Sequence, residues 1–314
     1  MLPPARAWRA AQGLGVMLTL ALLAGLVLRP APSLRLLWDM VIPLLPAIFL
    51  VNPMLWRNVC PLATLGHVGD RGRGARLRPD TLQWGWAAGA LLLFVLVPAR
   101  RFLFNENGGF LAGTIGAVGA LAAGGGFFFS RRAGFCNSIC PVLPVEKLYG
   151  QSPMLGVASA VCPDCTGCAA RGCIDLVGGQ SLLQGIGKPQ REDWRWMATP
   201  SGLFALLFPG FVLGYFHTVN GGLDTAPAVY GLVARWALSG AAILGLLGFA
   251  LGVGRRQALL LLGAGSVASY YWYAGPALAS VYGVPAPGPL VVRGGFLLLI
   301  GVWVVRAARQ EPHS

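Results

Sequence analysis

The sequence predicts an all-α membrane protein with about eight transmembrane helices. Of its 314 residues, 55% are hydrophobic and only 11% are charged, which is more apolar than an ordinary soluble domain. Apolar runs long enough to cross a bilayer, about 17–25 residues each, recur along the chain. The basic residues gather in the connections between these runs and give a formal net charge of +13, as is typical of multi-pass membrane proteins.

The predicted spans lie near residues 10–28, 36–55, 82–99, 109–130, 199–217, 228–252, 257–281 and 287–306. The first run follows Arg6 and Arg9, as a signal sequence would. However, it is long enough to span a bilayer, and it ends at Arg29-Pro30 instead of a small-residue cleavage site. We therefore predict that it is an uncleaved first span.

Two of these runs have unusual compositions. The second contains Pro43, Pro46 and Pro53, and each proline removes a backbone donor and weakens a straight helix. Counts of about seven or nine spans therefore stay open as alternatives. The fourth run carries a small residue at every fourth position, namely Ala112, Gly116, Ala120 and Gly124. This stripe favours close packing against a neighbouring helix.

Arginine and lysine set the predicted orientation in the membrane. The connections 56–81 and 131–198 are rich in basic residues, whereas 218–227 and 282–286 contain none. An even number of spans, with both termini in the cytoplasm of a bacterial inner (plasma) membrane, satisfies most of this pattern.

Two basic pairs are exceptions to this orientation, because Arg29 with Arg35, and Arg100 with Arg101, fall on the outer side. All seven cysteines lie in the cytoplasmic connections or at their edges. Thiols stay reduced in that compartment. The cysteines are therefore predicted to be available as ligands.

One connection concentrates four thiols in twelve residues, from Cys162 to Cys173. Cys162, Cys165 and Cys168 follow the spacing C-x2-C-x2-C, which wraps three sulfurs around one [4Fe-4S] cluster. Cys173 follows after four more residues; in two-cluster ferredoxins the fourth cysteine of such a run binds the other cluster. A structural zinc site and unmetallated thiols are the alternatives.

Three further cysteines occur in two shorter motifs. Cys136 and Cys140 form a C-x3-C-P motif, and Cys60 precedes Pro61. Both motifs follow an apolar span at the same predicted membrane face. They supply three thiols, so a second cluster would need Cys173, His67 or water as its remaining ligand. The alternative is that these cysteines are small, buried apolar residues.

These motifs resemble those of the membrane polyferredoxin-type [4Fe-4S] proteins. That group includes the quinol-dehydrogenase subunits of periplasmic nitrate reductase and accessory proteins of nitrous-oxide reduction and cytochrome-oxidase assembly. The resemblance covers roughly residues 50–175. It implies an integral membrane protein whose clusters pass electrons between quinol and a redox partner.

The cysteines of this chain can be compared one by one with the motifs of this group. Cys136 and Cys140 match the full C-x3-C-P motif, whereas Cys60 matches only its second cysteine, because Trp56 stands in place of the first. Cys162, Cys165 and Cys168 match the ferredoxin run. Cys173 comes one residue late, and Ile174 stands where proline is usual.

The predicted organisation has three parts. Residues 1–130 hold the N-terminal transmembrane helices and the Cys60 loop, 131–198 form a cytoplasmic, ferredoxin-like iron–sulfur segment, and 199–314 hold the C-terminal transmembrane helices. The middle segment is too short for a large core of its own. We expect it to fold around its metal, because ligation supplies stability that burial cannot.

The sequence therefore favours an iron–sulfur electron-transfer protein, with a quinol dehydrogenase-like subunit as its enzymatic form. Its expected partners are the lipid bilayer, quinol and another redox protein. A redox-sensing or metalloenzyme assembly and regulatory factor is the first alternative, and a transporter with a structural metal is the second. Nucleic acid is not an expected partner, because no basic surface interleaved with aromatic residues is visible.

Four arginines flank the cysteines, namely Arg57, Arg131, Arg132 and Arg171. Their positive charge would stabilise the reduced, more negative cluster and raise its potential. Setting the membrane topology would explain the same residues without any cluster.

Four other polar residues lie within or near spans, namely Asp39, His217, Arg235 and Arg293. Each is predicted to be an interfacial or ion-paired residue, with a role at a quinol site as the sharper alternative.

Overall fold

Every regular element in the described part of the chain is helical. The computed structural model describes residues 5–69, 79–129, 134–157, 194–285 and 287–309. No β-strand occurs among these residues. The predicted all-α class is therefore confirmed over the described ranges.

Six helices are long and apolar enough to cross a membrane: Arg6–Leu28, Pro30–Val51, Trp84–Phe104, Gly108–Phe128, Leu223–Ala250 and Gly288–Arg309. The first is α1 (Ala5–Leu28), and the second consists of α2 (Pro30–Arg35), η1 (Leu36–Val41) and α3 (Ile42–Val51) in series. The third consists of α6 (Pro79–Ala99) and η2 (Arg100–Phe104), and the fourth is α7 (Gly108–Phe128). The fifth consists of η6 (Leu223–Thr225) and α10 (Ala226–Ala250), and the sixth is α12 (Gly288–Arg309). The chain has the helices of a multi-pass membrane protein, and each coincides with a predicted run.

The other two predicted spans form helices of a different character. Helix α9 (Pro200–Phe216) is apolar but has only 17 residues. Helix α11 (Arg255–Val281) has 27 residues, but hydroxyl-bearing and small residues fill its middle. The eight-span count therefore stays a prediction.

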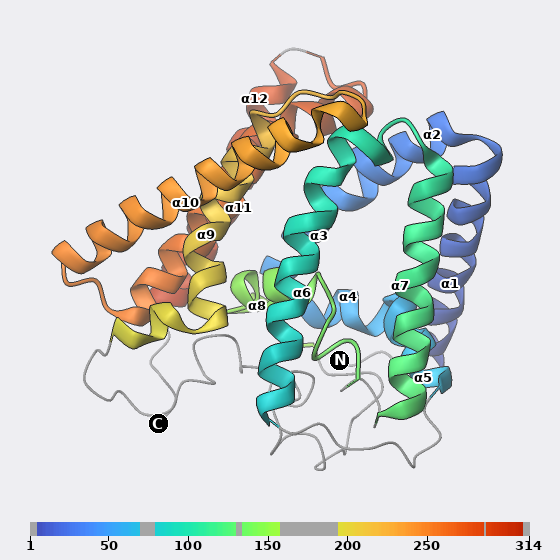
Figure 1. The fold of residues 1–314 in the computed structure, drawn as a ribbon, viewed down its shortest axis with the longest axis horizontal. Coiled ribbons are helices and arrows are strands. Elements are labelled where there is room, and N and C mark those ends of the chain that lie inside the picture. The colour runs from blue at the N-terminus through green and yellow to red at the C-terminus, as the bar shows by residue number, and fades with distance from the viewer. Residues whose placement is uncertain (1–4, 70–78, 130–133, 158–193, 286, 310–314) are drawn as a thin grey trace.

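The cysteine-bearing connections lie at one end of the helices. Figure 1 shows α4 (Pro53–Val59) and α8 (Leu143–Tyr149) at about mid-height beside α6, and α5 (Pro61–Gly69) lower, where α7 also ends. The α6–α7 turn and α2 lie at the upper end. Successive helices thus run in opposite directions, which brings the α4–α5 segment and the α7–α8 connection together.

The prolines of the second predicted span act differently: Pro43 and Pro46 lie inside α3, whereas α3 ends at Val51 and Pro53 begins α4. A π-helical segment, η1, carries the chain to Ile42, whose N–H bonds the carbonyl of Leu37. Further on, the Tyr271 hydroxyl accepts from the Ala47 N–H and donates to the Pro43 carbonyl, both at 2.8 Å. A fully buried side chain of α11 therefore bridges the helix where its own hydrogen bond is broken.

Of the small-residue stripe of α7, Ala112 packs against neighbouring residues, but a β-carbon on Gly116 or Gly124 would meet no atom, so the prediction of close packing along the whole stripe was wrong. Gly116 and Ala120 are exposed. The packed face instead includes Ala122 and Gly126, and the backbone of Gly126 meets that of Gly66 on α5. Small residues fill most of this helix, so a spacing of four fits more than one face, and only the neighbour decides which is used.

Arg100 and Arg101, which do not fit the predicted orientation, form hydrogen bonds at the end opposite the described cysteines. Arg100 donates to the Asn105 side chain at 3.1 Å and to the Tyr215 hydroxyl at 3.2 Å. Arg101 donates to Asn220 at 3.1 Å and to the Tyr215 carbonyl at 3.2 Å. These bonds join η2 to the end of α9, which gives both cations a structural role at this end.

We predict that Tyr271→Phe lowers the free energy of unfolding by about 1–3 kcal/mol, because it leaves a buried backbone donor and acceptor unsatisfied. Thermal unfolding in a mild detergent measures the change. Tyr273→Phe is the matched control, because it removes a hydroxyl from the same helix without breaking this bridge. Equal melting temperatures for the two variants would contradict the bridge.

Candidate functional site

The structure brings Cys60, Cys136 and Cys140 into one apolar cluster. Cys60 and Cys136 are each 8% exposed and pack with Phe135, while Cys140 packs against this group. The three thiols come from two connections that are far apart in the sequence. This convergence is the main chemical feature of the described residues.

Cys60 sits at the junction of two short helices. Its N–H closes the last turn of α4 by bonding the Trp56 carbonyl at 2.7 Å, and its own carbonyl accepts the Thr64 N–H at 3.0 Å in the first turn of α5. Pro61 follows, and a residue before proline is driven out of the helical region. Cys60 accordingly has ψ of 124°, which breaks the helix at this thiol.

The Cys136–Cys140 loop is a compact turn held by its own backbone. The N–H groups of Ser138 and Cys140 both bond the Phe135 carbonyl at 3.1 Å. The Ser138 hydroxyl donates to the Gly134 carbonyl at 2.6 Å. These bonds fix the spacing between the two cysteines of the C-x3-C-P motif.

Helix α6 supports this loop through two glycines one turn apart. A β-carbon on Gly85 would lie 2.7 Å from the β-carbon of Ser138, and one on Gly89 would lie 2.8 Å from the Cys140 carbonyl oxygen. Only glycine permits such an approach without a shift of the loop. The two glycines therefore set how closely the loop lies on the membrane helix.

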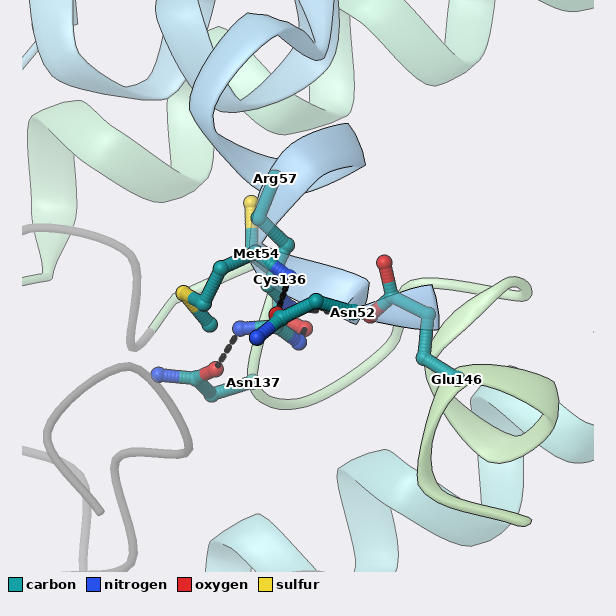
Figure 2. A network of polar contacts seen from close by, with 6 residues as sticks. All are labelled: Asn52, Met54, Arg57, Cys136, Asn137 and Glu146. Carbon is teal, nitrogen blue, oxygen red and sulfur yellow. Dashed lines mark hydrogen bonds and ion pairs between the residues drawn. The ribbon is translucent and has the colours of Figure 1, made fainter. Parts of the chain in front are cut away.

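A buried arginine connects the two cysteine-bearing connections (Figure 2). Arg57 of α4 donates from Nε to Glu146 Oε2 of α8 at 2.9 Å and from Nη1 to Asn137 Oδ1 at 3.0 Å. Its Nη2 lies 3.5 Å from the Cys136 carbonyl. Only 4% of either charged side chain is exposed. One guanidinium thus contacts groups beside Cys136 and on α8.

Further contacts fix the start of α4. The Asn52 side chain accepts the Met54 N–H at 2.7 Å and donates to the Leu155 carbonyl at 2.6 Å. The carbonyl of Asn58, which is fully buried, accepts from the Gln12 side chain at 3.0 Å. Segments on both sides of the cysteines are therefore tied to α4.

The buried pair is more costly to break than to keep. Removing one partner from a buried ion pair leaves an uncompensated charge and costs about 3–5 kcal/mol. An apolar replacement of both partners is often neutral for stability. The pair is therefore better explained by the geometry that it imposes than by the stability that it adds.

Glu146 also changes the expected electrostatics of Arg57. The sequence predicts that this arginine adds a positive field beside the cysteines, but the carboxylate at 2.9 Å offsets its charge. The remaining effect is a local dipole across the two connections. Arg131, Arg132 and Arg171 lie outside the described residues.

Burial raises the pKa of the Cys140 thiol to about 12, and the negative charges of Glu146 and Cys60 add to this effect. The Val142 backbone and Arg57 act weakly in the opposite direction. The metal-free thiol therefore keeps its proton at neutral pH. A bound metal would have to displace that proton, as metals do when thiolates become ligands.

Of the other predicted ligands, the structure describes only His67. Cys162, Cys165, Cys168 and Cys173 lie outside the described residues. His67 stands in the last turn of α5, about 10 Å along the helix from Cys60 at the rise of an α-helix. Within the described ranges, no three His, Cys, Asp or Glu side chains are grouped so as to hold a metal ion.

The donor set of the three thiols nevertheless fits part of an iron–sulfur site. Soft thiolates select iron–sulfur clusters and zinc over hard cations. An apolar surrounding limits solvent access, which tunes the potential of a cluster. The arrangement offers three sulfur donors within one apolar cluster, next to the polar contacts of Arg57.

Glu146 and Asn137 were missed by sequence reasoning. Glu146 is the single acidic residue between Glu106 and Asp164, and a lone acid in such an apolar stretch is a signal for a buried partner. Asn137 lies inside the motif, but nothing local marks it as a partner of Arg57. The pairing becomes visible only when the two connections meet.

The polar residues predicted near spans have ordinary structural contacts. His217 stacks on Trp236 with ring centroids 4.8 Å apart, and its Nδ1 lies 2.7 Å from the Leu213 carbonyl oxygen. Arg293 donates to the Trp272 carbonyl at 2.7 Å and lies over that indole ring. These contacts agree with the interfacial interpretation of both residues.

Comparison with known proteins adds no relative. No protein-family model, curated protein or solved structure matches this chain. The functional argument therefore depends on the residues themselves.

We predict that Gly89→Ala pushes the Cys136–Cys140 loop away from α6, because the added carbon meets the Cys140 backbone. The expected cost is about 1–3 kcal/mol of unfolding free energy. Cys140 should also react faster with maleimide, as measured by peptide mass spectrometry of metal-free protein. Gly113→Ala is the control, because a carbon there meets open space; equal alkylation rates in both variants would contradict the close approach.

Proposed function

We propose that this chain is a membrane-bound iron–sulfur protein that passes electrons between the quinone pool and a redox partner. Cys162, Cys165 and Cys168, with Cys173, would hold a [4Fe-4S] cluster. Cys60, Cys136 and Cys140 would contribute to a second one. Both would lie at the cytoplasmic side of a bacterial inner membrane.

One observation carries the proposal. Two connections far apart in the sequence deliver Cys60, Cys136 and Cys140 to one buried cluster, at the same end of the helices where the chain continues towards four more cysteines. Seven thiols in connections that the sequence predicts at one membrane face exceed what packing needs. The chemistry that uses such a set is soft-metal ligation.

The protein's own part in this function is to bind, orient and shield. A bound cluster would supply the one-electron chemistry. The thiols would hold it, the apolar residues around Cys60 and Cys136 would keep water out, and the short helices α4, α5 and α8 would fix the sulfur positions. The membrane helices would place the site within reach of a lipid-soluble donor.

Reduction by a quinol tests this function. Anaerobically purified protein in lipid nanodiscs is mixed with a short-chain quinol and frozen for EPR spectroscopy. We expect a reduced-cluster signal in wild type, because the quinol supplies the electron. Cys165→Ser should lose the part of that signal that belongs to the Cys162–Cys173 cluster, because serine is a poor ligand for iron–sulfur clusters.

Thr166→Ala is the matched control for this experiment. It changes a neighbouring residue of the same motif but removes no thiol, so the signal should persist. A protein that gives no signal even with dithionite would refute the proposal. A signal obtained with dithionite but never with quinol would favour the redox-sensing or assembly factor instead.

A further inference from the structure

The buried ion pair of Arg57 and Glu146 deserves a functional explanation because of where its contacts fall. Arg57 is three residues before Cys60, and Glu146 is six residues after Cys140. The guanidinium also contacts the Asn137 side chain and the Cys136 carbonyl. These contacts therefore join the segment that carries Cys60 to the segment that carries Cys136 and Cys140.

The geometry of the contacts needs a guanidinium. Three different nitrogens of Arg57 point to three different acceptors on two segments. A planar fork of fixed geometry can satisfy such acceptors together, whereas a lysine ammonium is a single point charge on a flexible stem. The fork thus fixes the distance and the angle between α4, the cysteine loop and α8.

The two charges act on the thiols in opposite directions. Arg57 lies against the Cys136 carbonyl, and its charge favours a negatively charged site. Glu146 opposes it, since its carboxylate faces the same buried region. Because the two charges nearly cancel, the pair adds structure to the site without a large net field.

We infer that Arg57 and Glu146 form a positioning pair, which holds Cys60, Cys136 and Cys140 together as one thiolate site and balances the charge beside it. This inference depends on the proposed function, because the ligand of that site is an iron–sulfur cluster. Neither residue touches the metal. They act through the backbone segments that carry the cysteines.

The test separates positioning from mere stability by measuring the reduction potential. In wild type, the signal of this site is identified as the one that Cys136→Ser removes and Cys165→Ser leaves. An EPR-monitored redox titration then gives its midpoint potential. The same titration is made on Glu146→Gln, Arg57→Met, Arg57→Lys and the double variant Arg57→Met with Glu146→Gln.

The single variants should shift the potential in opposite directions. Glu146→Gln keeps an acceptor for Arg57 but removes the negative charge, so the reduced cluster is favoured and the potential rises. Arg57→Met leaves Glu146 uncompensated, so the potential falls. In the double variant the shifts should cancel, while iron retention at this site weakens by about 10- to 100-fold, as with the loss of outer-shell partners.

The Arg57→Lys variant tests whether the planar guanidinium itself is needed. Arg57→Lys keeps the charge and should keep the potential close to that of wild type, but it should retain iron less well because it cannot bond all three acceptors. Arg309→Gln is the control for charge alone, since it removes one cation from the exposed end of α12. It should change neither quantity.

The outcomes distinguish this inference from the proposed function. Unchanged potentials, or shifts of the same sign in both single variants, would overturn the positioning pair while the clusters stand. A wild type with only the signal that depends on Cys165 would overturn the three-thiol site and its pair, but not the first cluster. If Arg57→Met does not fold, the rise in Glu146→Gln and the behaviour of Arg57→Lys still decide the matter.

Discussion

A single buried guanidinium links the two connections that carry Cys60, Cys136 and Cys140, on which the proposed chemistry depends. Arg57 bonds Glu146 and Asn137 where only 4% of the charged side chains meet solvent. A buried cation must be compensated, so these contacts determine how α4, the cysteine loop and α8 can be arranged. The proximity of Cys60 to Cys136 and Cys140 is the consequence.

Glycines on the neighbouring membrane helices allow the cysteine loop and α5 to pack closely against them. Gly85 and Gly89 of α6 let the cysteine loop lie directly on a helix backbone, and Gly126 of α7 lets α5 approach in the same way. In a bilayer, small residues give helices their closest contacts. The cysteine-bearing segments therefore pack directly on membrane helices, which suits a cluster whose reduction potential depends on fixed surroundings.

The sequence predicts local features of this fold well. Six of the predicted spans appear as long apolar helices, because length and hydropathy are properties of one segment. Alternation of the spans predicted only that Cys60 and the C-x3-C-P motif lie at the same membrane face; their packing in one cluster is a finding of the structure. In α7 the prediction failed, because small residues occur on several faces of the helix and only the neighbouring α5 selects one.

Contacts between distant segments could not be predicted. Tyr271 repairs a helix that lies 224 residues away in the sequence, and Arg57 is 89 residues from Glu146. Nothing in either local pattern announces its partner. A lone acid in an apolar stretch signals that some partner exists, but its identity depends on how the connections meet.

The iron and acid-labile sulfide content of wild-type protein purified without oxygen tests the account most directly. We expect a brown protein with about four irons and four sulfides per chain for one cluster, and about eight of each for two. A colourless protein without iron, or one that carries zinc in its place, would contradict the account.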